Sequence, residues 1–373
     1  MSILARICTR VAGLRRHPRA PGRLPGARPG RRGSQAAPRA LAAALLLGGL
    51  VACAAPPPAT APAALAPSAA GAPAELPRRA VSIGYAAPSA SFLPIYVAQE
   101  GGIFARHGLD VSLQQIQNNA GMAALVSGEL DVYDVASGSL VPAALSGADL
   151  VLIASDSNRT IFGLITTPDL AGPADLRGKT LGLTQRGASD EFVTRRYLLA
   201  RGLDPDADVV LQPVGGIPEK LLAMEVGQIS GGLVSPPTLF VALDKGMKLL
   251  DRPSELFEYQ GSGLVLQRAR LQGPDGERLG RALAESHVEA VQAIRADRDL
   301  ALRALDRYAP APSRAIAEQT LDWALAGIPA DSRPTLEGLQ AVIEDVLSAR
   351  GASAALDPRD LVDLRFLPAS ARQ

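Results

Sequence analysis

The sequence of 373 residues predicts an α/β fold built from two similar halves. From residue 80 onward, short strands alternate with helices of about ten residues, which is typical of a parallel sheet covered by helices. The order of elements then repeats, and three pairs of glycines recur at separations of 98, 94 and 99 residues: Gly84 and Gly182, Gly108 and Gly202, and Gly128 and Gly227. We therefore expect two βαβαβ units.

Each unit is delimited by apolar runs and by Gly, Pro and Ser loops. In the first unit we expect a strand and loop at 81–91, a helix and turn at 92–109, a strand at 110–117, a helix at 119–130 and a strand at 131–139. In the second unit the same elements are expected at 179–189, 190–203, 204–214, 215–229 and 230–238. The stretches 276–309, 313–327 and 335–351 have apolar residues at helical spacing and should pack onto a lobe.

The first eighty residues have a different character. Residues 1–40 contain ten arginines and no acidic residue, and residues 40–52 are apolar but too short to span a bilayer permanently. This is typical of a secretory signal with a long basic region, whose true start codon could lie further in. Leu50-Val51-Ala52-Cys53 resembles a bacterial lipobox, in which the cysteine is lipidated. The alternative is an ordinary signal peptide with an incidental cysteine.

The stretch that follows Cys53 is rich in alanine and proline up to residue 79 and should form a tether, because it offers little to bury in a core. Removing residues 1–52 takes away ten of the 38 basic residues and none of the 37 acidic ones, which leaves a formal charge of −9. An acidic body argues against a nucleic-acid partner. With Cys8 removed and Cys53 lipidated, the rest of the chain has neither a disulfide nor a reactive thiol.

Sequence motifs for catalysis are absent. His107 and His287 lack a second ligand at metal spacing, and neither a Gly-x-Ser-x-Gly elbow nor a phosphate-binding loop occurs. We therefore expect no catalytic residue, no metal and no cofactor. His107 is interpreted as a residue at a helix C-terminus and His287 as a surface or packing residue.

Ligands of parallel sheets bind beyond the carboxyl ends of the strands, so the loops there are the candidate site. These loops are small and polar, and they cover 88–91, 118–121 and 137–139 in the first unit and 186–189 and 235–237 in the second. Helices that begin near Ser91 and Ser189 would direct free N–H groups into the same space. Arg186 could hold an anionic group by charge-assisted hydrogen bonds. Each serine could instead be a helix cap without a ligand, and Ser155-Asp156-Ser157 is a further candidate.

Three stretches carry a family resemblance: "PIYVAQEGGIFARHGLDVSL" at 94–113, "LVSGELDV" at 125–132 and "DLRGKTLGL" at 175–183. Together they resemble the solute-binding proteins of nitrate-, sulfonate- and taurine-type ABC importers, a group related to pyrimidine-precursor binding proteins. The resemblance covers most of residues 81–265. The second unit departs from it, because "ISGGLVSPPT" lacks the acidic residue common after that glycine.

The resemblance implies a periplasmic-binding-protein type II fold, with two lobes that close on a solute by rotation about crossovers near 165 and 265. The first lobe would comprise 80–165 and 265–373, and the second 166–264. The implied ligand-binding residues are Pro88, Ser89, Ser91, Phe92, Asn119, Gly121, Ser137, Gly138, Arg186, Ser189 and Ser235.

The implied function is capture of a small polar or anionic organic solute and its delivery to an ABC permease with its ATPase subunit. The implied protein is an extracytoplasmic monomer, held at a membrane by lipidated Cys53. The first alternative is the same role for a pyrimidine or another aromatic vitamin precursor. The others are a lipoprotein that senses or binds a partner and a two-lobed biosynthetic enzyme.

Overall fold

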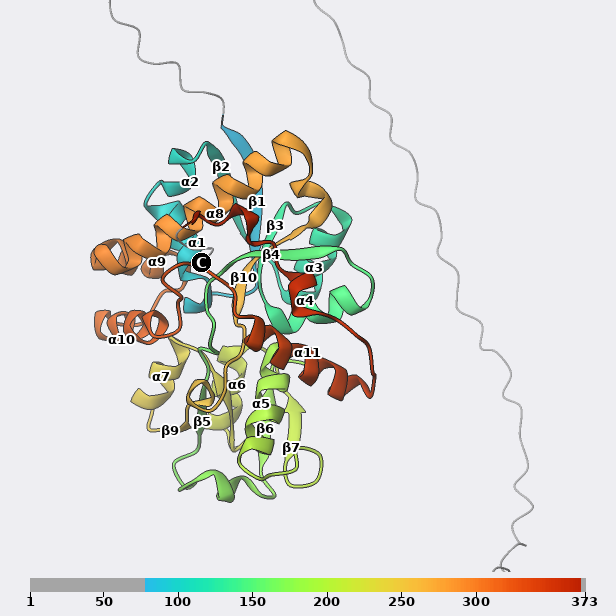
Figure 1. Ribbon diagram of the computed structural model, residues 1–373. Coiled ribbons are helices and arrows are strands. Elements are labelled where there is room, and N and C mark those ends of the chain that lie inside the picture. The colour runs from blue at the N-terminus through green and yellow to red at the C-terminus, as the bar shows by residue number, and fades with distance from the viewer. Residues whose placement is uncertain (1–77, 370–373) are drawn as a thin grey trace, which may run out of the picture. The chain divides into compact units, whose positions relative to one another are not determined.

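The computed structural model describes residues 78–369 (Figure 1). The expected signal sequence, Cys53 and almost all of the tether lie outside the described residues. No helix in the described range is both long enough and apolar enough to cross a membrane.

The first sheet has five strands in the order β2-β1-β3-β10-β4. Their bounds are β1 Arg79–Tyr85, β2 Leu109–Gln115, β3 Val132–Ala136, β4 Leu150–Ser155 and β10 Ser262–Gln267. The pairs of β1 with β2 and of β1 with β3 are parallel, whereas β10 runs antiparallel to both β3 and β4. Four of the five strands therefore point the same way.

The second sheet repeats this plan in the order β7-β6-β8-β5-β9. Its strands are β5 Gly163–Thr166, β6 Thr180–Leu183, β7 Val210–Pro213, β8 Gly231–Val234 and β9 Lys248–Asp251. Here β5 is the antiparallel strand, between β8 and β9. The two predicted units are thus matching, mostly parallel sheets, and each contains one reversed strand that follows a crossover from the other sheet.

The crossovers fix the lobe boundaries. The chain leaves the first sheet after Ser155 and enters the second at Gly163, and it leaves the second after Asp251 and returns at Ser262. The expected boundaries at 165 and 265 are therefore displaced by about one short strand: Gly163–Ile165 lie in the second sheet, and Ser262–Leu264 lie in the first. A short buried strand carries no signal for the sheet to which it belongs, which explains the displacement.

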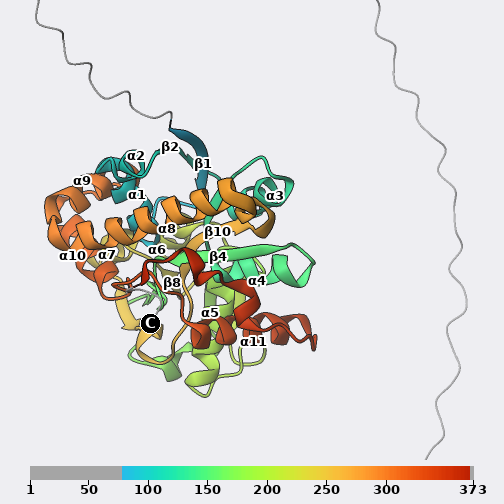
Figure 2. The same cartoon turned by 45° about the horizontal axis from the view of Figure 1, so that its top comes forward.

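Helices cover the first sheet on both faces. One core contains Ile83, Val132 and Ile153 with residues of α1, α2, α8 and α9, and the other contains Tyr133, Val135 and Leu152 with residues of α3 and α4. The helices are α1 Leu93–Glu100, α2 Ile103–Arg106, α3 Asn118–Ser127, α4 Ser137–Leu145, α8 Gly273–Ala296 and α9 Arg298–Tyr308. Figure 2 shows α8 crossing the sheet beside α1. The alternation of strand residues between the two cores is the period of two expected for a sheet buried on both faces.

The second sheet is covered by α5 Ser189–Ala200, α6 Ile217–Glu225 and α7 Thr238–Asp244. Two further helices close the chain, α10 Arg314–Leu325 and α11 Leu336–Arg350. Both start at side-chain caps, because Ser313 accepts a hydrogen bond from the Ile316 N–H and Thr335 accepts one from the Gly338 N–H.

Helix α11 contacts both lobes (Figure 1). It packs on α4 of the first lobe and α5 of the second, and Leu339, Val342 and Val346 share one buried cluster with Val141 and Leu198. The Arg196 guanidinium on α5 donates to Asp345 on α11 at 2.8 Å. The C-terminal part of the chain therefore does not belong to the first lobe alone, because α11 bridges the two lobes.

Candidate functional site

The predicted ligand loops of the two lobes meet one another. Ser89 Oγ lies 3.3 Å from Ser235 Oγ, and the Gln185 side-chain amide donates to Asn119 Oδ1 at 3.3 Å. At the third point, Gly138 lies so close to Ser189 that a Cβ at residue 138 would overlap the serine hydroxyl. These contacts bring the carboxyl ends of the two sheets face to face, as the sequence predicted.

The loop after β1 is held mainly by its own hydrogen bonds. Ser89 Oγ accepts from the Ser91 N–H at 3.2 Å, so Ser89 caps the short 3-10 helix Ala90–Phe92. The Ser262 hydroxyl donates to Ser91 O at 2.9 Å, which ties this loop to the start of β10. Pro88 is exposed, whereas Phe92 is buried with its ring 6.0 Å from that of Tyr85. Phe92 therefore serves the core of the first lobe in this structure.

At the start of α3, two predicted residues have different surroundings. Asn119 is exposed and faces Gln185 of the second lobe. Gly121 is buried against the ring of Tyr133, where any side chain would overlap the ring. Glycine at position 121 is thus explained by close packing.

Ser137 and Ser189 are the first residues of α4 and α5. Both hydroxyl oxygens are buried, and within residues 78–369 neither has a hydrogen-bond partner. Neither helix has a side-chain cap, because the residue before each serine is alanine. Buried polar groups are normally paired, so these two hydroxyls at facing helix N-termini retain hydrogen-bonding capacity that the described residues do not use.

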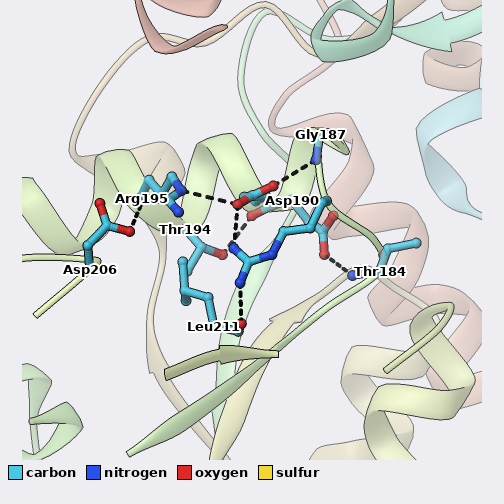
Figure 3. A network of polar contacts seen from close by, with 9 residues as sticks. Thr184, Gly187, Asp190, Thr194, Arg195, Asp206 and Leu211 are labelled. Atoms are coloured by element: carbon cyan, nitrogen blue, oxygen red, sulfur yellow. Dashed lines mark hydrogen bonds and ion pairs between the residues drawn. The ribbon is translucent and has the colours of Figure 1, made fainter. Parts of the chain in front are cut away.

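Arg186 is engaged inside its own lobe, in a polar network of which Figure 3 labels Gly187, Arg195 and Leu211. Its guanidinium donates to Glu191 Oε1 at 2.8 Å and to Leu211 O at 2.7 Å. Although burial raises the pKa of Glu191, hydrogen bonds from the Gly187 N–H, Arg186 and Arg195 outweigh it and hold that pKa below its usual value. The charge of Arg186 is therefore shared with a carboxylate that is itself buried.

A buried ion pair supports the same loop. Lys220 on α6 is fully buried, and its Nζ donates to Asp190 Oδ2 at 2.6 Å and to Leu233 O at 2.9 Å. The same carboxylate oxygen accepts the Thr184 N–H at 2.7 Å, which fixes the end of β6 against the first turn of α5. This pair sets the position of the loop 184–189. Sequence reasoning missed it, because nothing local distinguishes Lys220 from a surface lysine.

A second buried polar cluster lies under the first lobe's loops. His287 on α8 is 2.8 Å from Asp156 Oδ1 through Nε2 and 2.8 Å from Ser332 Oγ through Nδ1. Asp134 on β3 is also fully buried, and neither of its carboxylate oxygens has a partner among the described residues. Burial and the nearby charge of Asp156 raise the pKa of Asp134 well above its ordinary value. The sequence singled out Asp156 but gave no sign of Asp134 or of a buried His287.

His107, the other histidine of the described range, follows α2 as predicted, and its Nε2 lies 2.7 Å from Glu289 Oε2. Among residues 78–369, no group of three or more His, Cys, Asp or Glu side chains could hold a metal ion.

Residues 89–249 match the family model described as NMT1/THI5 like. No curated protein matches the sequence significantly. The match lies within the region from which the resemblance was inferred and includes most of the predicted ligand loops.

Solved structures share the fold. The periplasmic aliphatic sulphonate binding protein SsuA from Escherichia coli is 19% identical, with a TM-score of 0.64 over 76% of this chain and 92% of that one. The alkanesulfonate-binding protein SsuA from Xanthomonas axonopodis pv. citri, bound to MOPS, is 19% identical, with a TM-score of 0.63 over 78% and 99%. The periplasmic nitrate-binding protein NrtA from Synechocystis PCC 6803 is 15% identical, with a TM-score of 0.57 over 66% and 70%.

The class of protein follows from fold and site together. The chain has the two-lobed α/β fold of periplasmic substrate-binding proteins, with its polar loops where the two sheets face each other. The predicted fold class and the resemblance to the nitrate- and sulfonate-type binding proteins are confirmed. The three similar structures are named as binding proteins.

Proposed function

We propose that this protein captures a small polar or anionic organic solute between its two lobes and delivers it to an ABC permease. The observation that carries the proposal is the pair of buried, unpaired hydroxyls of Ser137 and Ser189 at the N-termini of α4 and α5. One comes from each lobe, and both lie at the predicted ligand loops. The similarity to sulfonate- and nitrate-binding proteins supports the same class of solute.

The chemistry of the two helix N-termini suits an oxygen-rich group. The first N–H groups of a helix lack acceptors inside it, and the helix dipole places partial positive charge there. A sulfonate, nitrate or carboxylate would accept hydrogen bonds from these N–H groups and from the two hydroxyls. Because Arg186 is already shared by Glu191 and Leu211 O, we propose that it shapes loop 184–189, and that serine hydroxyls and backbone N–H groups make the direct contacts.

Removing both unpaired hydroxyls tests this site. We expect the Ser137→Ala, Ser189→Ala double variant to bind its solute at least tenfold more weakly, since each lost hydrogen bond to a polar ligand contributes about 1 kcal/mol or more. Isothermal titration of the full chain measures the affinity. Ser146→Ala is the matched control, because its hydroxyl donates to Pro142 O at the other end of α4. Equal affinities in the double variant and the control would remove these helices from the site.

Solute capture requires that the lobes approach closely, because contacts from both exist together only in a closed form. We expect Gly138→Val to hold the lobes apart, since even one Cβ at residue 138 overlaps Ser189. The expected result is a larger radius of gyration in solution scattering and an affinity at least tenfold weaker. Unchanged dimensions and affinity would show that the approach of these two loops is not part of binding.

The remaining elements of the proposal concern location. We propose that residues 1–52 are a lipoprotein signal, that Cys53 is acylated, and that residues 53–79 tether a monomeric body outside the cytoplasm. The sequence around Cys53 and the similarity to periplasmic proteins support this. Metabolic labelling with a fatty acid should mark the wild-type chain and not the Cys53→Ser variant. Equal labelling of both would contradict the anchor.

A further inference from the structure

A cavity of about 330 Å³ lies beside the two crossovers. Its walls come from both crossovers, from α7 of the second lobe and from α10 and the turn after it. Figure 1 shows α7 and α10 next to each other. The main lining residues are Arg159, Ile161, Phe240, Arg252, Asp322 and Trp323. None of them is among the residues predicted to bind the solute. We call this space the hinge cavity.

Aromatic and apolar groups form one side of the hinge cavity. The indole of Trp323 is fixed by a hydrogen bond of 2.8 Å from Nε1 to Ile161 O. The Phe240 ring meets it edge to face, with centroids 5.8 Å apart. A volume of this size and these flat walls suit a single ring or a branched apolar group.

Two guanidinium groups, those of Arg159 and Arg252, also line the hinge cavity and make part of it positively charged. Arg252 lies over the Trp323 ring at 3.7 Å, and its Nη1 is 3.6 Å from Glu255. Arg159 donates from Nη1 to Ser254 O at 3.0 Å, its one side-chain hydrogen bond within residues 78–369. A guanidinium has five N–H donors in a fixed plane, so Arg159 retains donors for a carboxylate.

The charges around the hinge cavity do not cancel. Asp322 also lines it, but its Oδ1 accepts from Arg298 Nη1 at 2.6 Å. Counting the lining charges with these partners gives three arginines (Arg159, Arg252 and Arg298) against two carboxylates, those of Asp322 and Glu255. A single negative charge on a ligand would balance the set.

We propose that the hinge cavity is a second binding site, specific for a small monoanion with a flat or branched apolar body, of which benzoate is the simplest probe. The ring would lie against Trp323 and Phe240, and the carboxylate would be held by Arg159 and Arg252. Because the walls belong to both crossovers and both lobes, a bound molecule favours the lobe arrangement in which these walls are assembled.

The chain contains one tryptophan, Trp323, so its fluorescence reports directly on the hinge cavity. Titration of the full chain with benzoate should give a saturable change in tryptophan emission. In Arg159→Gln the apparent dissociation constant should rise at least tenfold. Arg314→Gln is the matched control, because Arg314 is on α10, the helix that carries Trp323, but pairs with Glu318 and Asp299 and does not line the cavity.

Three results would overturn this proposal. The first is emission that does not saturate with benzoate, and the second is equal weakening in Arg159→Gln and Arg314→Gln. The third is equally tight binding of benzyl alcohol, which has the ring without the charge. Trp323 emission does not depend on the ligand loops between the lobes. A negative benzoate titration would therefore overturn the hinge cavity as a binding site without bearing on the proposed solute site. Arg252 is left unchanged, since its removal would alter the tryptophan baseline by itself.

Discussion

Replacing Lys220 with methionine is expected to lower the free energy of unfolding by about 3–5 kcal/mol, the usual cost of leaving a buried charge without its partner. Lys220 is fully buried, and its ammonium group contacts Asp190 at 2.6 Å, with Asp190 itself 3% exposed. Methionine fills much of the same space but leaves the Asp190 carboxylate with only the Thr184 N–H as a close donor. Urea unfolding of the two proteins measures the difference.

The double variant Lys220→Met, Asp190→Asn separates charge from shape. It should recover most of the loss, because an asparagine oxygen can still accept the Thr184 N–H while no buried charge remains. Arg314→Gln, which breaks exposed ion pairs, should cost no more than about 1 kcal/mol. If the double variant were as unstable as the single one, the pair would not be acting through its charges.

The second large effect concerns pH. We expect Asp134→Asn to be more stable than the wild type at alkaline pH, with a difference that grows as the pH rises. Burial and the charge of Asp156 raise the pKa of Asp134 in the folded protein, whereas in the unfolded chain it is about 4. The contribution of Asp134 to the free energy of unfolding is therefore fully present below about pH 4, and it is lost as the pH rises through the raised pKa.

Between those two pKa values, the Asp134 contribution falls by about 1.4 kcal/mol for each pH unit. The ionisable groups that interact with Asp134 include Asp156, Tyr96 and Tyr133, and His287 contacts Asp156; both proteins retain all four. The difference between the two unfolding curves at pH 5, 7 and 8.5 therefore isolates Asp134. The exposed Asp275→Asn should show no such trend. A gap that stays constant over this range would show that Asp134 is ionised throughout.

Much of the fold could be predicted from the sequence because it depends on local patterns. The repeat of glycines and strands predicted both sheets. Helices were expected to begin near Ser91 and Ser189; Ser91 lies in the 3-10 helix Ala90–Phe92 directly before α1, and Ser189 is the first residue of α5. The reversed strands β5 and β10 were not assigned to their sheets, because their neighbours are set by pairing far along the chain. The bridging role of α11 depends on contacts with α4 and α5 that no periodicity reveals.

The positions of the loops at the candidate site could be predicted from the sequence, but the side-chain pairs within it could not. The loops were found from strand ends, and the contacts of Ser89 with Ser235 and of Asn119 with Gln185 show that they face each other. The pairing of Arg186 with Glu191 could not be predicted, because it requires the turn at Gly187 that folds the arginine back. His287 and Asp156 are 131 residues apart, so only the packed structure reveals their contact.

Equilibrium titration of the full chain against alkanesulfonates, nitrate, carboxylates, amino-pyrimidines and flavin precursors tests whether the two lobes bind a small solute. We expect saturable 1:1 binding of one of these classes, lost in the Ser137→Ala, Ser189→Ala double variant and retained in Ser146→Ala. The bound solute should also raise the melting temperature, because ligand at a hundred times its dissociation constant adds about 2.7 kcal/mol of stability. A solute that binds equally well to the double variant would exclude the N-termini of α4 and α5 as the site, and a folded protein that binds none of these compounds would argue against capture of such a solute.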